Sequence, residues 1–68
     1  MTFTVEFELE DDGRWLAEVL ELPGVLAYGQ TSDEAIAKAQ ALALRILADR
    51  LEHAEGTSEY LNIHFAAA

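Results

Sequence analysis

The chain contains no cysteine, only four basic side chains and no apolar run that approaches the roughly 18 residues needed to span a membrane. The lack of cysteine excludes disulfides and thiolate metal sites as a means of stabilising the fold. The N-terminus also lacks the basic start and long apolar segment of a signal peptide. We therefore expect a cytoplasmic protein that does not cross a membrane.

The scarcity of basic residues leaves a strong charge imbalance. Thirteen acidic side chains stand against four basic ones, and the formal net charge at pH 7 is −9. So much negative charge on a small body repels phosphate backbones, which argues against direct nucleic-acid binding. It favours fast encounter with a basic protein partner instead.

The length and composition indicate one small globular domain. The chain has 68 residues, of which 51% are hydrophobic and 25% charged. We expect a single domain over residues 1–68, with its core in 2–65 and a frayed tail at 66–68. A chain of this size buries only about 60% of its unfolded surface, so its monomer should be marginally stable. Association into a homodimer or homotetramer is the remaining way to bury more apolar surface.

The first twenty residues predict a β-hairpin. Apolar and polar residues alternate strictly over residues 2–10, which is typical of a half-buried strand. Asp11-Asp12-Gly13 then suits a three-residue loop, because Gly13 can adopt a positive φ. This loop pairs Leu9 with Trp15 and keeps apolar residues opposite apolar ones, whereas a slip of one residue would reverse the faces. The face turned away from the core then carries Glu6, Glu8, Leu16, Glu18 and Leu20.

The next elements are a short strand and a long helix. Leu22-Pro23-Gly24 interrupts the second strand, and a third strand follows over residues 25–28. Thr31 and Glu34 form a capping box, in which the threonine hydroxyl serves the Glu34 amide and the Glu34 carboxylate reaches back. We expect the helix to run from residue 32 to about residue 54, with Gly56 as its stop.

The last segment, residues 59–65, alternates again and predicts a fourth strand. Its inward residues should be Leu61, Ile63 and Phe65, and its outward residues Tyr60, Asn62 and His64. A right-handed crossover from the third strand places the fourth strand beside the first and parallel to it. The expected fold is α+β, a two-layer β-β-β-α-β arrangement with a mixed four-stranded sheet of order 3-2-1-4 and one long helix on one face.

The predicted helix carries two apolar faces. The broader face would cover the sheet and consists of Ala35, Ile36, Ala39, Leu42, Ala43, Ile46 and Leu47. The opposite face has heptad-like spacing and many small residues, which is typical of a helix–helix contact. We call this second face the back seam; it consists of Ala37, Ala41, Leu44, Ala48 and Leu51. We expect the back seam, together with Leu16 and Leu20, to lie in contacts between copies of the chain.

Three motifs in order resemble the HicB-type antitoxin family. They are Asp12-Gly13-Arg14-Trp15 in the hairpin, Leu20-Glu21-Leu22-Pro23-Gly24-Val25 at the turn, and Tyr28-Gly29-Gln30-Thr31-Ser32-Asp33-Glu34-Ala35 at the helix start. The family usually has an acidic residue in place of Gln30 and a cysteine in place of Val25. The resemblance covers most of the chain and implies a partial ribonuclease-H-like fold. It also implies a non-enzymatic antitoxin, whose partner is a small basic mRNA-cleaving toxin of double-stranded-RNA-binding fold.

The family's usual DNA-binding segment has no counterpart here, so operator binding is not carried over. The toxin-neutralising function would remain. Glu6, Glu8 and Glu18 share one predicted strand face and could mimic the phosphates that a basic ribonuclease binds. The alternative is that these carboxylates only keep a small protein soluble.

No catalytic, cofactor or metal site is evident in the sequence. Asp11 and Asp12 are adjacent at a hairpin tip, where acidic residues favour the turn. Glu6 and Glu8 share a strand face, yet no third ligand for a two-metal site is evident. His53 and His64 have no ligand spacing, and His53 is better placed to interact with the helix C-terminus. Two further hypotheses stay open. The chain is an orphan structural or regulatory oligomer without a toxin partner, or it forms a ligand or enzyme site at a subunit interface.

Overall fold

The computed structural model describes residues 1–54 and 59–68 and contains four strands, one α-helix and one 3₁₀ turn. The strands are β1 (Thr2–Leu9), β2 (Trp15–Val19), β3 (Leu26–Gly29) and β4 (His64–Ala67). The helix α1 spans Ser32–Glu52, and the 3₁₀ turn η1 spans Glu59–Leu61. The sheet has the order β3-β2-β1-β4, with β4 parallel to β1 and the other pairs antiparallel. The predicted β-β-β-α-β fold and its strand order are confirmed.

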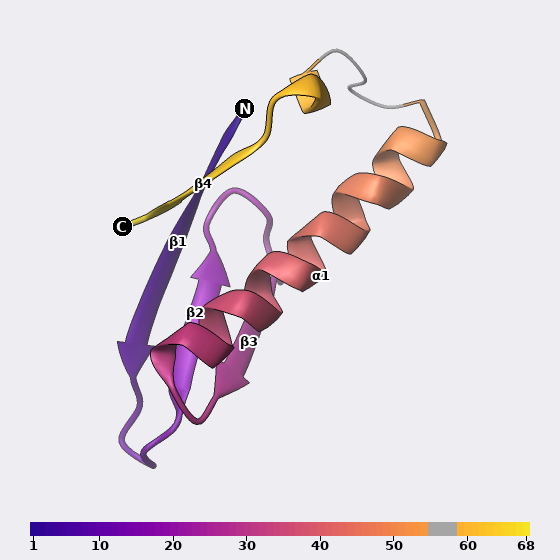
Figure 1. The fold of residues 1–68 in the computed structure, drawn as a ribbon. Helices are drawn as coiled ribbons and strands as arrows, with labels where there is room; N and C mark the ends of the chain where they lie inside the picture. Colours follow the sequence, from indigo (N-terminus) through magenta and orange to yellow (C-terminus); the bar gives the residue numbers. More distant parts are fainter. Residues whose placement is uncertain (55–58) are drawn as a thin grey trace.

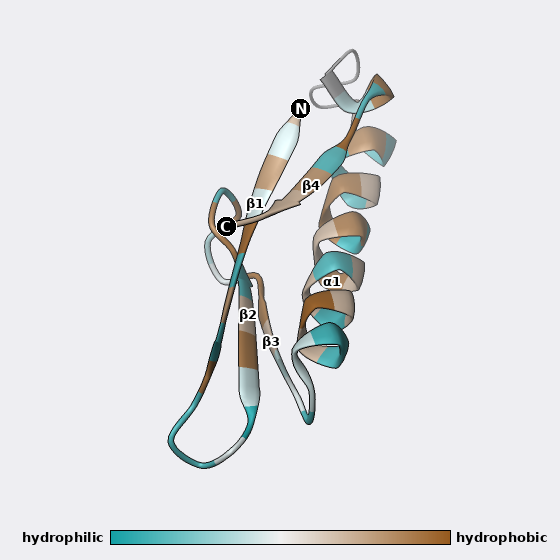
Figure 2. Cartoon of the chain, turned by 60° about the vertical axis from the view of Figure 1, so that its left-hand side comes forward, coloured by the Kyte–Doolittle hydropathy of each residue, from teal (hydrophilic) through white to brown (hydrophobic). Residues whose placement is uncertain are grey.

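The hairpin has the predicted register. Val5 lies opposite Val19, Phe7 opposite Ala17, and Leu9 opposite Trp15. The amide of Glu10 donates to the carbonyl of Arg14, which leaves the predicted loop of residues 11–13. Gly13 has a φ of +89°, the positive value that the loop requires. Hydrophobic and hydrophilic residues alternate along β1 in Figure 2, and this alternation separates the two faces of the sheet.

The helix α1 packs on one face of the sheet and makes the second layer (Figures 1 and 2). Its residues Ala35, Ala39, Ala43 and Leu47 are fully buried, as the predicted core stripe requires. The strands and the turn between β2 and β3 contribute the other buried core residues, which are Phe3, Val5, Ala17, Val19, Leu22 and Val25. Small alanines on both sides of this contact allow the helix to approach β2 and β3 closely.

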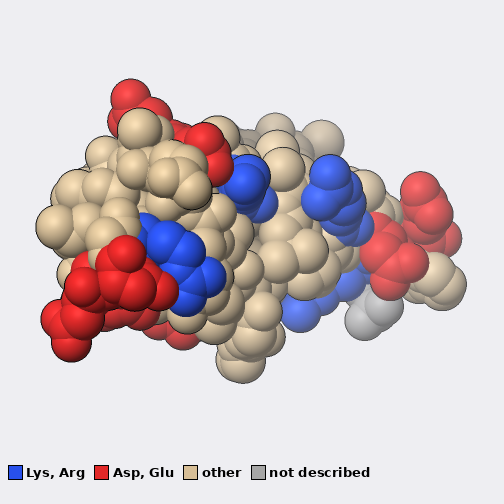
Figure 3. Space-filling view, turned by 90° about the horizontal axis from the view of Figure 1, so that it is seen from below, with Lys and Arg blue, Asp and Glu red and all other residues tan. Residues whose placement is uncertain are grey.

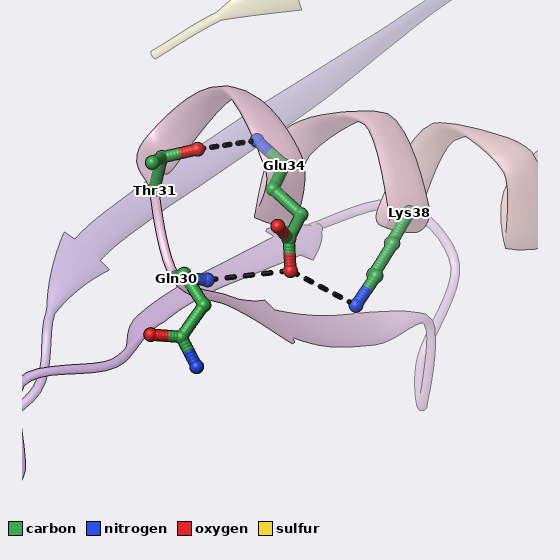
Figure 4. Close-up of polar contacts among 4 residues, drawn as sticks. All are labelled: Gln30, Thr31, Glu34 and Lys38. Atoms are coloured by element: carbon green, nitrogen blue, oxygen red, sulfur yellow. Dashed lines mark hydrogen bonds and ion pairs between the residues drawn. The ribbon is translucent and has the colours of Figure 1, made fainter.

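The helix begins as predicted and ends slightly earlier. The Thr31 hydroxyl accepts a hydrogen bond from the Glu34 amide at 3.1 Å (Figure 4). The Glu34 carboxylate reaches back past Thr31 and accepts from the Gln30 amide at 3.3 Å, and it also pairs with Lys38 at 3.1 Å. At the other end, the helix stops at Glu52, two residues before the predicted limit, and Ala54 has a φ of +58°. Gly56, the predicted stop, lies outside the described residues.

The last strand differs from its prediction. It begins at His64 rather than at residue 59, and the preceding η1 leaves the Leu61 side chain 90% exposed instead of turned into the core. Tyr60, expected to face outward, packs against the core with Ile63 and Phe65. The expected frayed tail is ordered: Ala66 and Ala67 pair with β1, and the Ala68 amide donates to the Val5 carbonyl.

The second half of β1 lies outside the core. Phe7 and Leu9 point to the same side of the sheet as Phe3 and Val5, yet they are 39% and 58% exposed. The reason is the path of α1, which crosses β2 and β3 and contacts β1 much less (Figure 1). The expectation that these apolar residues share the core therefore holds only for the first half of the strand.

Candidate interaction surface

The face of the sheet opposite α1 has no second layer among the described residues. We call it the outer face. By strand alternation it carries acidic and apolar side chains together. Its members are Thr2, Thr4, Glu6 and Glu8 from β1; Leu16, Glu18 and Leu20 from β2 and the turn after it; Leu26 and Tyr28 from β3; and His64 and Ala66 from β4.

The outer face brings together the three glutamates that the sequence singled out. Glu6 lies directly opposite Glu18 across the β1–β2 pair, and Glu8 lies one pair further along, opposite Leu16. Like charges that face each other across two strands repel. The three side chains line a hollow of about 350 Å³. The remaining lining residues are Phe7, Leu16 and Ala68.

Two of the basic side chains, Arg14 and Lys38, are paired with other carboxylates. Arg14 pairs with Asp12 at 2.8 Å and lies over the Tyr28 ring, 4.1 Å from its centroid. The Arg14 amide and guanidinium both donate to Asp12 and lower the pKa of that carboxyl. Lys38 pairs with Glu34 on the helix. Within the described part of the chain, the carboxylates of the three outer-face glutamates therefore have no cation partner.

Acidic and basic side chains both appear on the face of the molecule seen from below Figure 1. Figure 3 views the molecule from below Figure 1 and shows the few basic side chains lying between groups of acidic ones. Because a carboxylate without a counter-charge keeps its hydration and its repulsion, a cationic surface that docks there gains favourable charge pairing.

One polar contact at the border of this face was missed by the sequence analysis. The Glu21 carboxylate accepts hydrogen bonds from the Thr4 amide and the Thr4 hydroxyl, both at 2.7 Å. Both bonds lower the pKa of Glu21, and the bond from the Thr4 amide has the larger effect. They fasten the turn after β2 to β1. Glu21 follows the end of a strand, where the alternation that located the other glutamates no longer applies.

The proposed oligomer residues fall on two separate surfaces. Leu16 and Leu20 belong to the outer face, and Leu16 lines the same hollow as the glutamates. The back seam runs along α1 on the side away from the sheet. Its leucines, Leu44 and Leu51, are 48% and 40% exposed, and its alanines do not belong to the core.

The described residues contain no group of three or more His, Asp or Glu side chains that could hold a metal ion. The Nδ1 atom of His53 lies 2.7 Å from the Asp49 carbonyl, which matches its predicted place at the helix C-terminus. His64 is exposed at the start of β4. No helix in the described part of the chain is both long and apolar enough to cross a membrane.

No protein-family model, curated protein or solved structure matches this chain. The motifs that resemble the HicB-type family have local structural roles here. Gly13 and Gly24 provide positive φ angles in their turns, and Thr31 caps α1. These roles explain why such residues suit this fold. They do not bear on which partner the chain binds.

Proposed function

We propose that the chain is a non-enzymatic, HicB-like antitoxin-type protein that binds and masks a small basic mRNA-cleaving toxin. The observation that supports this most is the hollow on the outer face, with Glu6, Glu8 and Glu18 on its walls and no described cation to neutralise them. Exposed Leu20, Leu26 and Tyr28 surround the carboxylates with apolar area. An acidic centre among apolar side chains fits the RNA-binding surface of a basic ribonuclease.

Masking requires only that the outer face occupies the surface where the toxin would hold RNA. The carboxylates take the place of phosphates and pair with the lysines or arginines of the toxin. Their contribution is mainly to the rate of encounter and to partner choice, and it weakens as salt screens the charges. Leu16 and Tyr28 supply the contact area that keeps the complex together.

The test requires a small basic protein encoded in a reading frame beside that of this chain. We expect a stoichiometric amount of the chain to stop that protein from cleaving RNA, and we expect inhibition to weaken between low and high salt. RNA cleavage is followed by gel electrophoresis at several ratios of the two proteins. Full cleavage in the presence of excess chain, or the lack of any such neighbouring frame, would favour the orphan oligomer instead.

We further propose that the back seam of α1 pairs with the same seam of a second copy. The seam is centred on Leu44, with Ala37 and Leu51 at equal distances on either side. An antiparallel pair of helices therefore places each Ala37 opposite Leu51 of the partner subunit and brings the two Leu44 side chains together.

This arrangement predicts that Leu44→Glu lowers the native mass to that of the 7.5 kDa monomer. Two buried glutamates would face each other at the centre of the seam, which strongly disfavours association. Arg45→Gln is the matched control, because it changes the charge equally on the neighbouring position. Light scattering after size exclusion measures both masses. An unchanged mass for the glutamate variant would place the self-contact elsewhere.

A further inference from the structure

The strand β3 has one uncovered side. It pairs with β2 on one side, and no other strand in the described part of the chain pairs with it on the other. In Figure 1 it forms the margin of the sheet on the side away from β4. β3 lies in the interior of the chain, and both the turn before it and the helix cap after it are described. We call the uncovered side of Leu26–Gly29 the β3 edge.

Two residues of the β3 edge direct their main-chain groups away from the sheet. The Val19 amide donates to the Val25 carbonyl, so the main-chain groups of Val25 face β2. Successive residues of a strand direct their N–H and C=O groups to opposite sides. Leu26 and Tyr28 therefore present their N–H and C=O groups to the outside. No other backbone group of the described residues hydrogen-bonds to them there.

The side chains at the β3 edge are exposed and uncharged. Leu26 is 41% exposed and Tyr28 is 38% exposed. β3 consists of Leu-Ala-Tyr-Gly and contains no acidic or basic residue, whereas β1 and β2 hold the three glutamates of the outer face. Sheet edges are commonly protected from pairing with another chain by charged side chains. The β3 edge lacks this protection, although the whole chain has a net charge of −9.

We propose that the β3 edge pairs with the β3 edge of a second copy, antiparallel and about a two-fold axis, so that the two sheets become one. An uncharged edge is the place where two copies of a strongly acidic chain meet with little repulsion. This inference concerns how the copies assemble. It goes beyond the masking function and does not depend on it.

The directions of the main-chain groups fix the register of this pair. Outward residues must face outward residues, and an antiparallel pair centred on Ala27 is the register that gives both of them a partner. Leu26 then lies opposite Tyr28 of the partner subunit, and this pair exchanges both of its main-chain hydrogen bonds. The two-fold axis repeats the pair on the other side of Ala27.

The joined outer face keeps like charges apart. Leu16 lies opposite Tyr28 in the β2–β3 pair, so Leu16, Tyr28 and Leu26 of both copies form an apolar band at the centre. Glu18 lies outside this band on β2. Three strand spacings, about 14 Å, separate β2 from β2 of the second copy. This distance exceeds the screening length of about 8 Å at physiological salt, so the glutamates of the two copies do not oppose pairing.

The contact at the β3 edge is short and therefore weak. Four residues of strand span about 13 Å, and small contacts dissociate readily on dilution. We expect a dissociation constant of about 0.1 mM. The β3 edges thus pair in concentrated solution and separate on a size-exclusion column, where the back seam alone sets the mass.

The first test measures amide hydrogen exchange of the unmodified chain by NMR at about 0.05 mM and about 1 mM. The amides of Leu26 and Tyr28 should exchange about threefold more slowly at the higher concentration, because a larger fraction of the chain is paired. The amide of Asp11, in the hairpin loop, is the reference and should not change. Pairing through the back seam leaves Leu26 and Tyr28 unaffected, since that seam lies on the side of α1 away from the sheet. Equal rates at both concentrations would overturn the proposal, and so would slowing that requires an added basic protein.

The second test removes one outward N–H group. Tyr28→Pro lacks this donor, which the β2–β3 pair does not use, and proline is accepted at such positions of edge strands. The exchange of the Leu26 amide should then no longer depend on concentration. Tyr28→Ala is the matched control, because it loses the same ring, keeps the amide and should keep the concentration dependence.

Loss of the concentration dependence in both variants would show that the Tyr28 ring, rather than strand pairing, holds the copies together. Retention in both would equally overturn pairing through the β3 edge. The exchange of the unmodified chain decides the proposal even if the proline variant does not fold. None of these results touches the masking function, which the RNA-cleavage assay decides separately.

Discussion

Replacing Glu6, Glu8 and Glu18 together by lysine is expected to abolish inhibition of the basic partner, with a loss of affinity of about 100-fold or more. The change turns the walls of the hollow from acidic to basic and raises the net charge of −9 by six units. Attraction becomes repulsion at the centre of the contact, which costs far more than the loss of a rim charge. Binding is measured by fluorescence titration, and inhibition by RNA cleavage.

The matched control is Asp11→Lys/Asp33→Lys/Asp49→Lys, which changes the net charge equally at exposed positions away from the outer face. If only overall charge mattered, both triple variants would lose inhibition to the same extent. If the outer face is the binding surface, the control keeps most of its activity at moderate salt, where distant charges are screened. Unimpaired inhibition by the glutamate variant would show that the partner binds elsewhere.

Gly29→Ala is expected to destabilise the fold by about 3 kcal/mol or more, at the upper end of the range for overpacked sites. A Cβ atom on Gly29 would lie 2.6 Å from the Ala35 backbone nitrogen and 3.0 Å from the Glu34 Cβ. The obstacle is the backbone of the first helical turn, which cannot rotate away. Relief requires α1 to move off β3, and this motion opens the core at Ala35.

Gly24→Ala separates this clash from the general effect of replacing glycine. Gly24 has a φ of +85°, and nothing lies within 4 Å of the position its Cβ would take. Its substitution should cost only about 1–2 kcal/mol, the price of a left-handed alanine. Urea denaturation gives both free energies of unfolding. Equal losses for the two variants would mean that the helix is not held against Gly29 as described.

The hairpin, the helix and the strand order were all predictable because each depends on local pattern or on simple topology. A slip of one residue in the hairpin would place Glu18 opposite Phe7 on the buried face. The alternation of apolar and polar residues therefore favoured the pairing of Phe7 with Ala17, which the structure has. The capping threonine marked the start of α1. The same alternation placed Glu6, Glu8 and Glu18 on one face, and the structure confirms that they lie together.

The last strand was placed wrongly because alternation alone does not supply a pairing partner. β1 begins at Thr2, which lies opposite His64, so residues before His64 lie beyond the start of that strand. They turn into η1 instead, and Leu61 is left exposed. Ala66 and Ala67 have weak strand propensity, yet β1 offers them free backbone groups, and they pair.

The hollow and the exposure of Phe7 and Leu9 could not be predicted either, because both depend on how the strands and the helix pack in three dimensions. The helix follows the strands with the smallest side chains, where Ala17 and Gly29 allow close approach. β1 is therefore left uncovered beyond Val5. No property of Phe7 itself distinguishes it from Phe3, which has the same chemistry and is buried.

The contact between Glu21 and Thr4 also makes folding a proton-linked equilibrium. The pKa of Glu21 is lower in the folded chain than its ordinary value of 4.5, so the unfolded chain takes up the proton more readily. The stability that this contact gives is fully present above that ordinary value and is lost as the pH falls through the lowered one. Asp12 and Glu34, with lowered pKa values of their own, behave in the same way at the hairpin and at the helix start. On acidification, the carboxylates that fasten these three junctions are thus protonated at a lower pH than ordinary carboxyl groups.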